Sequence, residues 1–203
     1  MDPAPSRSLR LFVALAPPEP IRRRLLALQA ELRRAAGAAA AEVRWVAPEN
    51  VHLTLQFLGG VPEERRAAVE AALTAAAAAT PPFHLDVHGA GAFPSGRRAR
   101  VLWAGVGGEL EVLGGLATDL GRRLAALGYA SETRPFAAHL TLGRARDPRG
   151  VPGLAAALAR CAEGPSARWA VEEAVLFRSH LSPHGPRYEA LARPRLGTAA
   201  PRT

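Results

Sequence analysis

Apolar residues recur along this chain with two periods, which predict helices and strands in alternation. The helical period is clearest after Glu19, where Ile21, Leu25, Leu28 and Leu32 share one face and arginines occupy the other. Four stretches have this spacing or an alanine-rich helical composition, at residues 19–36, 62–79, 110–127 and near 151–161. Glycines directly after the first and third stretches are expected to end those helices.

Short apolar or alternating runs between proline, glycine and polar residues predict the strands. They lie at residues 9–16, 43–46, 51–58, 83–87, 101–106, 138–144, 169–177 and 188–192. The Gly59-Gly60 pair is expected to close the third strand, and residues 89–98 are expected to form a loose connection. Because several strands follow one another through short links, the sheets are expected to be largely antiparallel, in an α+β fold rather than a doubly wound one.

The tetrapeptide His-Leu-Thr-Leu occurs twice, at residues 52–55 and 139–142, so that one copy falls in each half of the chain. In a strand the His and Thr of each copy would share one face and the two leucines the other. This repeat predicts a bilobal, pseudo-two-fold fold with two mainly antiparallel sheets, flanked by helices, around a central cleft. The absence of a long linker predicts a single domain over residues 9–196, with flexible tails at 1–8 and 197–203.

Composition leaves the partner of this chain open. The net charge of +8 indicates a polyanionic partner, with nucleic acid as the first candidate. All 26 basic residues are arginine, however, and alanine is very abundant, which is equally typical of a GC-rich coding bias.

Cysteine and hydropathy exclude several classes of protein. Cys161 is the single cysteine, so neither an internal disulfide nor a metal site with paired thiolates is possible. No apolar run approaches the roughly 20 residues of a membrane-spanning helix. The run from Leu9 to Ala16 is short and ends in Pro17-Pro18, which favours a strand over the core of a signal peptide. We expect a cytoplasmic monomer without a metal or a cofactor.

The repeated residues suit chemistry on a phosphate. Hydrolysis of a cyclic phosphate requires a base that activates water and an acid that protonates the departing oxygen, and imidazole serves both because its pKa lies near 6.5. Thr54 and Thr141 can donate hydrogen bonds to phosphate oxygens, and Arg144 can add a bidentate positive charge. A single His-x-Thr is most often only a polar strand face, and a duplicated scaffold could repeat it without chemistry. Repetition of the same polar pair, in a chain with six histidines, favours a paired site.

The segments around the two motifs resemble the 2H phosphoesterases. The likeness rests on Phe57-Leu58-Gly59 after the first motif, on Arg134-Pro135-Phe136 before the second, and on Arg144 after it. The branch to which the chain is similar is that of the bacterial and archaeal RNA 2′,3′-cyclic phosphodiesterases, also known as 2′-5′ RNA ligase-like proteins. One departure is Ala138, where the family usually has proline.

This resemblance implies metal-independent hydrolysis of an RNA 2′,3′-cyclic phosphate end to a 2′-phosphomonoester. It implies that His52 is the proton donor to the leaving oxygen and that His139 is the proton acceptor that activates water. Thr54, Thr141 and Arg144 become contacts of the phosphate, and the aromatic ring of Phe57 can face the nucleobase. Strict alternation places Phe57 on the leucine side of its strand, so its role requires a bulge or a strand end.

Other functions remain open at this point. The same residues could join RNA ends through 2′-5′ bonds or open a small cyclic nucleotide, and a non-catalytic module could bind RNA ends. Two symmetric imidazoles favour catalysis, because recognition of phosphate alone would favour arginine or lysine. The remaining histidines are interpreted as surface or rim residues, namely His84, His88, His180 and His184.

Overall fold

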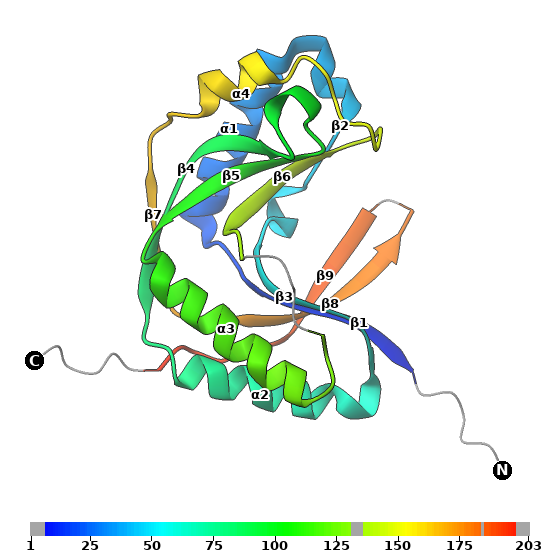
Figure 1. Ribbon diagram of the computed structural model, residues 1–203, viewed down its shortest axis with the longest axis vertical. Coiled ribbons are helices and arrows are strands. Elements are labelled where there is room, and N and C mark those ends of the chain that lie inside the picture. The colour runs from blue at the N-terminus through cyan, green and yellow to red at the C-terminus, as the bar shows by residue number, and fades with distance from the viewer. Residues whose placement is uncertain (1–6, 131–135, 184, 198–203) are drawn as a thin grey trace, which may run out of the picture.

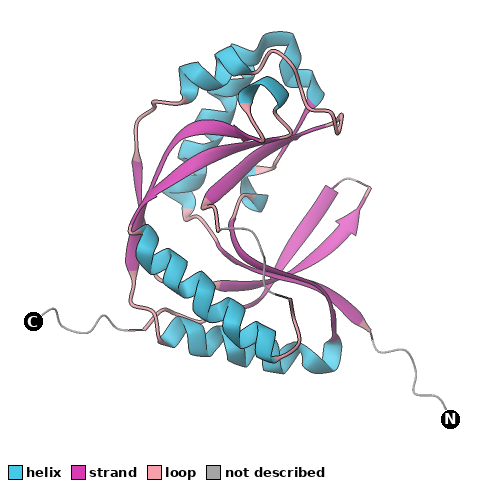
Figure 2. Ribbon diagram, viewed as in Figure 1, coloured by secondary structure: helices cyan, strands magenta, loops and turns pink. Residues whose placement is uncertain are grey.

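Two antiparallel sheets lie one above the other, with helices on their outer sides (Figures 1 and 2). The computed structural model describes residues 7–130, 136–183 and 185–197. Every strand pair within the sheets is antiparallel, which confirms the predicted α+β fold. Within the described ranges, no helix is long and apolar enough to cross a lipid bilayer.

The lower sheet has four strands in the order β3-β1-β8-β9. These strands are β1 (Ser8–Leu15), β3 (Leu53–Pro62), β8 (Val175–Ser182) and β9 (Gly185–Ala192). The upper sheet has five strands in the order β2-β6-β5-β4-β7. They are β2 (Val43–Trp45), β4 (Phe83–Phe93), β5 (Val101–Gly108), β6 (His139–Ala145) and β7 (Ala167–Val171).

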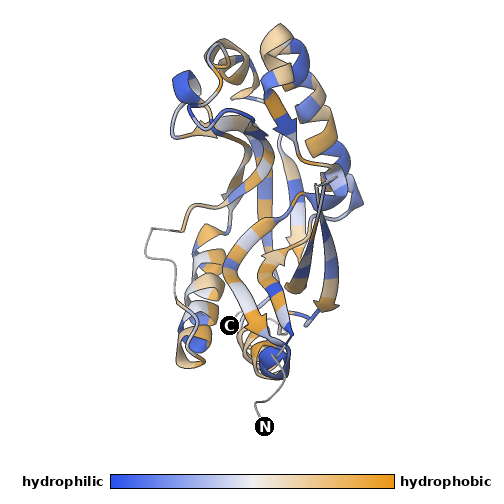
Figure 3. Ribbon diagram, turned by 90° about the vertical axis from the view of Figure 1, so that its right-hand side faces the viewer, coloured by the Kyte–Doolittle hydropathy of each residue, from blue (hydrophilic) through white to orange (hydrophobic). Residues whose placement is uncertain are grey.

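The helices pack in pairs on the outer sides of the two sheets. Helices α1 (Glu19–Ala36) and α4 (Ala155–Cys161) contact each other and the upper sheet, and α2 (Arg66–Ala78) packs with α3 (Leu110–Ala126) at the lower sheet (Figure 1). The predicted apolar face of α1 is buried. Figure 3 shows both hydrophilic and hydrophobic bands on the helices, as expected of helices that cover a core on one side. Short 3-10 turns span Gly37–Glu42, Pro48–Asn50, Glu63–Arg65 and Gly96–Arg98.

Each sheet combines strands from both halves of the chain. The four-stranded sheet joins β1 and β3 to β8 and β9, and the five-stranded sheet joins β2 and β4 to β5, β6 and β7. After β1 the chain crosses to the other sheet, forms α1 and β2 there, and returns as β3 (Figure 1). The two motif strands therefore lie in different lobes, but neither lobe is a contiguous half of the sequence.

Three strands depart from the predicted bounds. Gly59-Gly60 does not end β3, because both glycines pair with β1. The expected loose connection after residue 89 is largely strand, since β4 continues to Phe93 past a bulge at Gly89, whose φ of +49° suits glycine. The predicted strand 169–177 is two strands in different sheets, and the chain crosses between them around Glu173, which bridges to Arg195.

The fourth helix and the chain ends also differ from expectation. Helix α4 begins only at Ala155, because Val151 is held in an isolated bridge with Ala99. Ser8 belongs to β1, and the backbone N–H of Gly197 donates hydrogen bonds to the carbonyls of Ala77 and Thr80. The rest of the predicted tails, residues 1–6 and 198–203, lies outside the described residues.

Candidate active site

The first motif begins with His52, directly before β3, and continues along β3, where a bulge changes the alternation of side chains. Thr54 pairs with Ala14 and Gln56 pairs with Val13, so that Leu55 is an extra residue in the ladder. Phe57, which pairs with Phe12, consequently lies on the same face as Thr54. Its side chain is 63% exposed, whereas strict alternation would have buried it behind the strand.

The second motif lies on β6 and carries the same bulge at the corresponding leucine. Thr141 pairs with Trp103 and Gly143 pairs with Leu102, which leaves Leu142 as the extra residue. Arg144 therefore joins Thr141 on one face of the sheet. Phe57 follows His52 at the same spacing as Arg144 follows His139. The two residues therefore occupy equivalent positions, with an aromatic ring in one lobe and a guanidinium in the other.

Both imidazoles are fixed by the same local hydrogen bond. Nδ1 of His52 lies 2.7 Å from the carbonyl oxygen of Asn50, and Nδ1 of His139 lies 2.7 Å from the carbonyl oxygen of Ala137. A carbonyl only accepts, so in each ring Nδ1 is the donor. In the neutral ring this tautomer leaves Nε2 of each histidine unprotonated and able to accept a proton.

Aromatic rings surround the two histidines in a similar way. The ring of Tyr188 is perpendicular to that of His52 at a centroid distance of 5.2 Å, and the ring of Phe93 is perpendicular to that of His139 at 5.2 Å. Phe12 lies 4.8 Å from His52 and is stacked on Phe177 at 5.2 Å. Sequence reasoning assigned no role to these rings, because they come from strands distant in sequence that only the sheets bring together.

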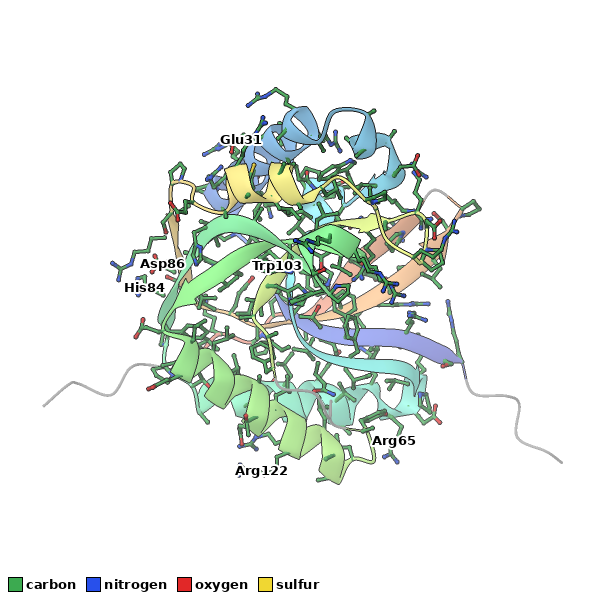
Figure 4. All side chains as sticks on the ribbon, turned by 45° about the horizontal axis from the view of Figure 1, so that its top comes forward. Glu31, Arg65, His84, Asp86, Trp103 and Arg122 are labelled. Carbon is green, nitrogen blue, oxygen red and sulfur yellow. The ribbon has the colours of Figure 1, made fainter. Side chains whose placement is uncertain are left out.

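Trp103 lies on β5 (Figure 4), where it pairs with Thr141 of the second motif. Its indole covers Gly91, where a Cβ atom would lie 2.2 Å from the ring, so the strand requires glycine at this position. The ring of Phe93 lies 5.2 Å from the indole. The indole Nε1 is buried and has no hydrogen-bond partner among the described residues.

The two motifs interact electrostatically although they belong to different sheets. Strand β3 contacts β6. Burial lowers the pKa of His52, and the charges of Arg144 and His139 lower it further, against the opposing effect of the hydrogen bond to Asn50. Burial raises the pKa of Tyr188, against the effect of Arg144 and Arg10. Arg10 on β1, His52 directly before β3, Arg144 on β6 and Tyr188 on β9 therefore lie within electrostatic reach of one another.

The groups predicted to hold phosphate lie on the faces that carry the histidines. Thr54 and Thr141 are half-buried, and Arg144 is exposed. Within the described part of the chain, no carboxylate forms a salt bridge with Arg144. Nor do the described residues include three His, Cys, Asp or Glu side chains grouped to hold a metal ion.

The other histidines lie apart from the paired motifs. His84 is exposed at the outer end of the upper sheet (Figure 4), with its Nδ1 3.6 Å from Glu109, and His88 is exposed on the same strand. Nε2 of His180 lies 2.6 Å from Glu189 in the β8–β9 hairpin. His184, predicted at the rim, and Arg134-Pro135 of the family likeness lie outside the described residues.

Two buried glutamines support the motif strands, and sequence reasoning missed both. Gln29 on α1 is 2% exposed, and its Nε2 donates to the carbonyls of Val46 and Leu142, each at 2.8 Å. The side chain of Gln56 donates to the carbonyl of Ala130 at 3.0 Å. The sequence offered one sign of the role of Gln29, which is its position beside the apolar residues of a predicted helix, where a polar side chain needs a buried hydrogen-bond partner.

Two facing sheets, each with a histidine and a threonine on the face away from its helices, define the class of two-histidine phosphoesterases. The sequence profile of the family described as "LigT like Phosphoesterase" matches residues 15–103 and 109–188. The chain belongs to this family.

Relatives and solved structures agree with this assignment. A protein of Archaeoglobus fulgidus is 36% identical over 183 residues, 90% of this chain and 98% of the relative, and one of Methanothermobacter thermautotrophicus is 33% identical over 180 residues, 89% and 95%. Both are named RNA 2′,3′-cyclic phosphodiesterase. The crystal structure of a Thermus thermophilus protein matches with a TM-score of 0.75 at 30% identity, over 95% of this chain and all of the other. E. coli LigT complexed with 3′-AMP matches with a TM-score of 0.73 at 31% identity, over 94% and 99%.

Proposed function

We propose that this protein hydrolyses the 2′,3′-cyclic phosphate at RNA ends to a 2′-phosphomonoester, with two histidines and no metal ion. The observation that carries the proposal is the matching hydrogen bond of His52 and His139: each Nδ1 is bonded to a carbonyl, and neither Nε2 has a hydrogen-bond partner among the described residues. The names of the relatives support the choice of substrate. The E. coli structures with 3′-AMP and with phosphate support a site for a nucleotide and its phosphate group.

The reaction follows from the two roles that we assign to the imidazoles. His139, with Nε2 unprotonated, takes a proton from water, whose oxygen attacks phosphorus in line with the departing 3′ oxygen. His52, with Nε2 protonated, gives its proton to that oxygen as the P–O3′ bond breaks. Thr54, Thr141 and Arg144 stabilise the charge on the other phosphate oxygens. Phe57 offers a face on which the nucleobase can stack.

The experiment is a turnover assay on an oligonucleotide that ends in a 2′,3′-cyclic phosphate, in excess EDTA, with the position of the product phosphate determined. We expect a 2′-phosphomonoester and full activity in EDTA. Activity that is lost in EDTA and restored by Mg²⁺ or Zn²⁺ would contradict the two-histidine reaction. Joining of ends, or turnover of small cyclic nucleotides alone, would replace the proposal with one of the other functions that the motifs allow.

Alanine variants of the two histidines serve as controls for this assay. Each substitution should lower the rate by roughly 10²–10⁴-fold, the usual worth of a general acid or base. A substrate with a nitrophenolate leaving group needs no proton on the departing oxygen, so it should partly rescue His52→Ala but not His139→Ala. Rescue of the second variant alone would reverse the assigned roles, and full activity of either variant would end the acid–base proposal.

A further inference from the structure

Two arginines lie directly opposite each other at the edge of the five-stranded sheet. Arg44 on β2 pairs with Arg144 on β6, and paired residues on neighbouring strands point to the same face. The flanking pairs Val43–Ala145 and Trp45–Gly143 lie on the other face, where Val43 is buried in the core. Arg44 is therefore exposed on the face that carries Arg144, His139 and Thr141.

Two like charges on neighbouring strands are expected to be unfavourable in the free protein. Like charges directly opposite each other on two strands destabilise the pair. Among the residues that the structure describes, neither Arg44 nor Arg144 has a carboxylate in salt-bridge distance, although other surface arginines such as Arg66 and Arg193 do. A bound group with more than one negative charge would relieve the repulsion. The pair is thus better suited to a ligand than to the stability of the fold.

We propose that Arg44 forms a second phosphate subsite, which binds the phosphodiester next to the terminal cyclic phosphate and makes the enzyme prefer an RNA chain end to a mononucleotide. This proposal rests on the proposed function. It adds a substrate contact outside the His-Leu-Thr-Leu motifs and their flanking residues.

The position of Arg44 favours the neighbouring phosphate over the terminal one. In the proposed reaction the terminal phosphate is contacted by the two histidines, the two threonines and Arg144, which lie directly before β3, on β3 and on β6. Arg44 lies one strand further out, about 4.8 Å away across the sheet, on the edge strand β2. A chain that continues from the histidines past Arg144 over this edge brings its next phosphate within reach of the second guanidinium.

The experiment compares Arg44→Ala with the wild type on a nucleoside 2′,3′-cyclic phosphate and on a dinucleotide that ends in one. We expect kcat/KM for the dinucleotide to fall about tenfold, as expected for the loss of a charge-assisted contact, and kcat/KM for the mononucleotide to stay within about twofold. The logarithmic salt dependence of dinucleotide binding should become shallower by about 0.7, the share of one phosphate contact on a single strand. An equal loss on both substrates, or no loss on the dinucleotide, would overturn the proposal.

Two further variants separate a local contact from the general positive charge. Arg146→Ala removes the same charge two residues from Arg144, from a side chain whose Nε donates to the carbonyl of Ala41 instead. It should leave the preference for the dinucleotide intact, and a loss as large as that of Arg44→Ala would overturn the proposal. Arg44→Lys should keep the salt dependence of the wild type. The melting temperature of Arg44→Ala should be unchanged or raised, because the repulsion is removed, and a fall of several degrees would indicate a structural role instead.

Binding distinguishes failure of this subsite from failure of the proposed reaction. If the wild type turns over neither substrate, the proposed function fails, and Arg44 is still tested by the affinity for a dinucleotide with a terminal 2′-phosphate against that for a nucleoside 2′-phosphate. Wild-type preference for the dinucleotide, reduced in Arg44→Ala, supports the subsite. The subsite is overturned if the wild type binds both ligands equally, or if Arg44→Ala keeps the preference of the wild type for the dinucleotide.

Discussion

At the scale of single residues, the site consists of two imidazoles held in the same way in unlike surroundings. Each Nδ1 donates to the carbonyl two residues earlier, which fixes the tautomer and the direction of Nε2. His52 is enclosed by Phe12, Phe177 and Tyr188, whereas His139 has the ring of Phe93 beside it. Burial lowers the pKa of His52, so its neutral form dominates in the free protein at neutral pH. In the proposed reaction His52 is the proton donor, so we expect it to take up its proton when the negative charge of the substrate arrives.

We therefore expect the pKa of His52 to lie below the usual 6.5 in the free protein. Added inorganic phosphate should raise this pKa, because a nearby negative charge favours the protonated ring. The pH titration of the His52 ring by NMR, with His52→Gln to assign its resonances, measures both values. Titration above 6.5 without phosphate would contradict the effect of burial.

The lowered pKa of His52 also determines how the stability of the protein changes with pH. The unfolded chain binds a proton at His52 more readily than the folded one, so the contribution of His52 to the unfolding free energy is fully present above pH 6.5. It is lost as the pH falls from 6.5 through the lower folded pKa. The melting temperature of the wild type should consequently fall more between pH 7.5 and pH 5 than that of His52→Gln.

At the scale of elements, the two bulges decide which side chains share a face. Without the extra residue Leu142, Arg144 would point to the side of α1, and without Leu55, Phe57 would point into the core. Gln29 donates to the carbonyl of Leu142 at the bulge itself, so a polar residue of α1 supports the position of a phosphate ligand on β6.

The substitution Gln29→Leu tests this support. It leaves the buried carbonyls of Val46 and Leu142 without the amide, and should lower the unfolding free energy by about 1–3 kcal/mol. Because the bulge positions Arg144, kcat/KM should also fall at temperatures well below the melting temperature. Leu28→Ala, a buried change on the same helix, is the matched control: it should cost about 2–5 kcal/mol of stability while the folded protein keeps its activity. Unchanged activity in Gln29→Leu would show that the bulge holds without the amide.

At the scale of the whole molecule, the exchange of strands between the two sheets makes each lobe depend on both halves of the chain. The crossing segments place β1 and β8 side by side in the lower sheet, although they lie near opposite ends of the sequence. Residues 9–196 should accordingly behave as one domain, since no contiguous half contains a complete sheet.

This arrangement predicts a single cooperative unfolding transition. The three tryptophans, Trp45, Trp103 and Trp169, all lie in the five-stranded sheet, so their fluorescence reports on that lobe, while far-ultraviolet circular dichroism reports on both. The two signals should give coincident melting curves. A separate transition seen by dichroism alone would mean that the four-stranded sheet unfolds independently.

The sequence by itself determined what depends on short-range periodicity. The apolar spacing predicts α1 and α3 almost to the residue. Residues three and four positions apart share one face of a helix, so the pattern can be followed from its first turn to its last. The two His-Leu-Thr-Leu copies likewise predict a paired site, because the exact repetition of rare polar residues can be recognised without knowledge of the fold.

Only the tertiary structure decided on which face of each sheet the residues after the two motifs lie. A bulge arises from the register between two strands, so nothing in the local pattern at Leu55 or Leu142 predicts the face of Phe57 or Arg144. Arg44 comes opposite Arg144 through a pairing of segments a hundred residues apart. Periodicity describes one segment and its two sides, whereas pairing is a property of two segments that tertiary packing brings together.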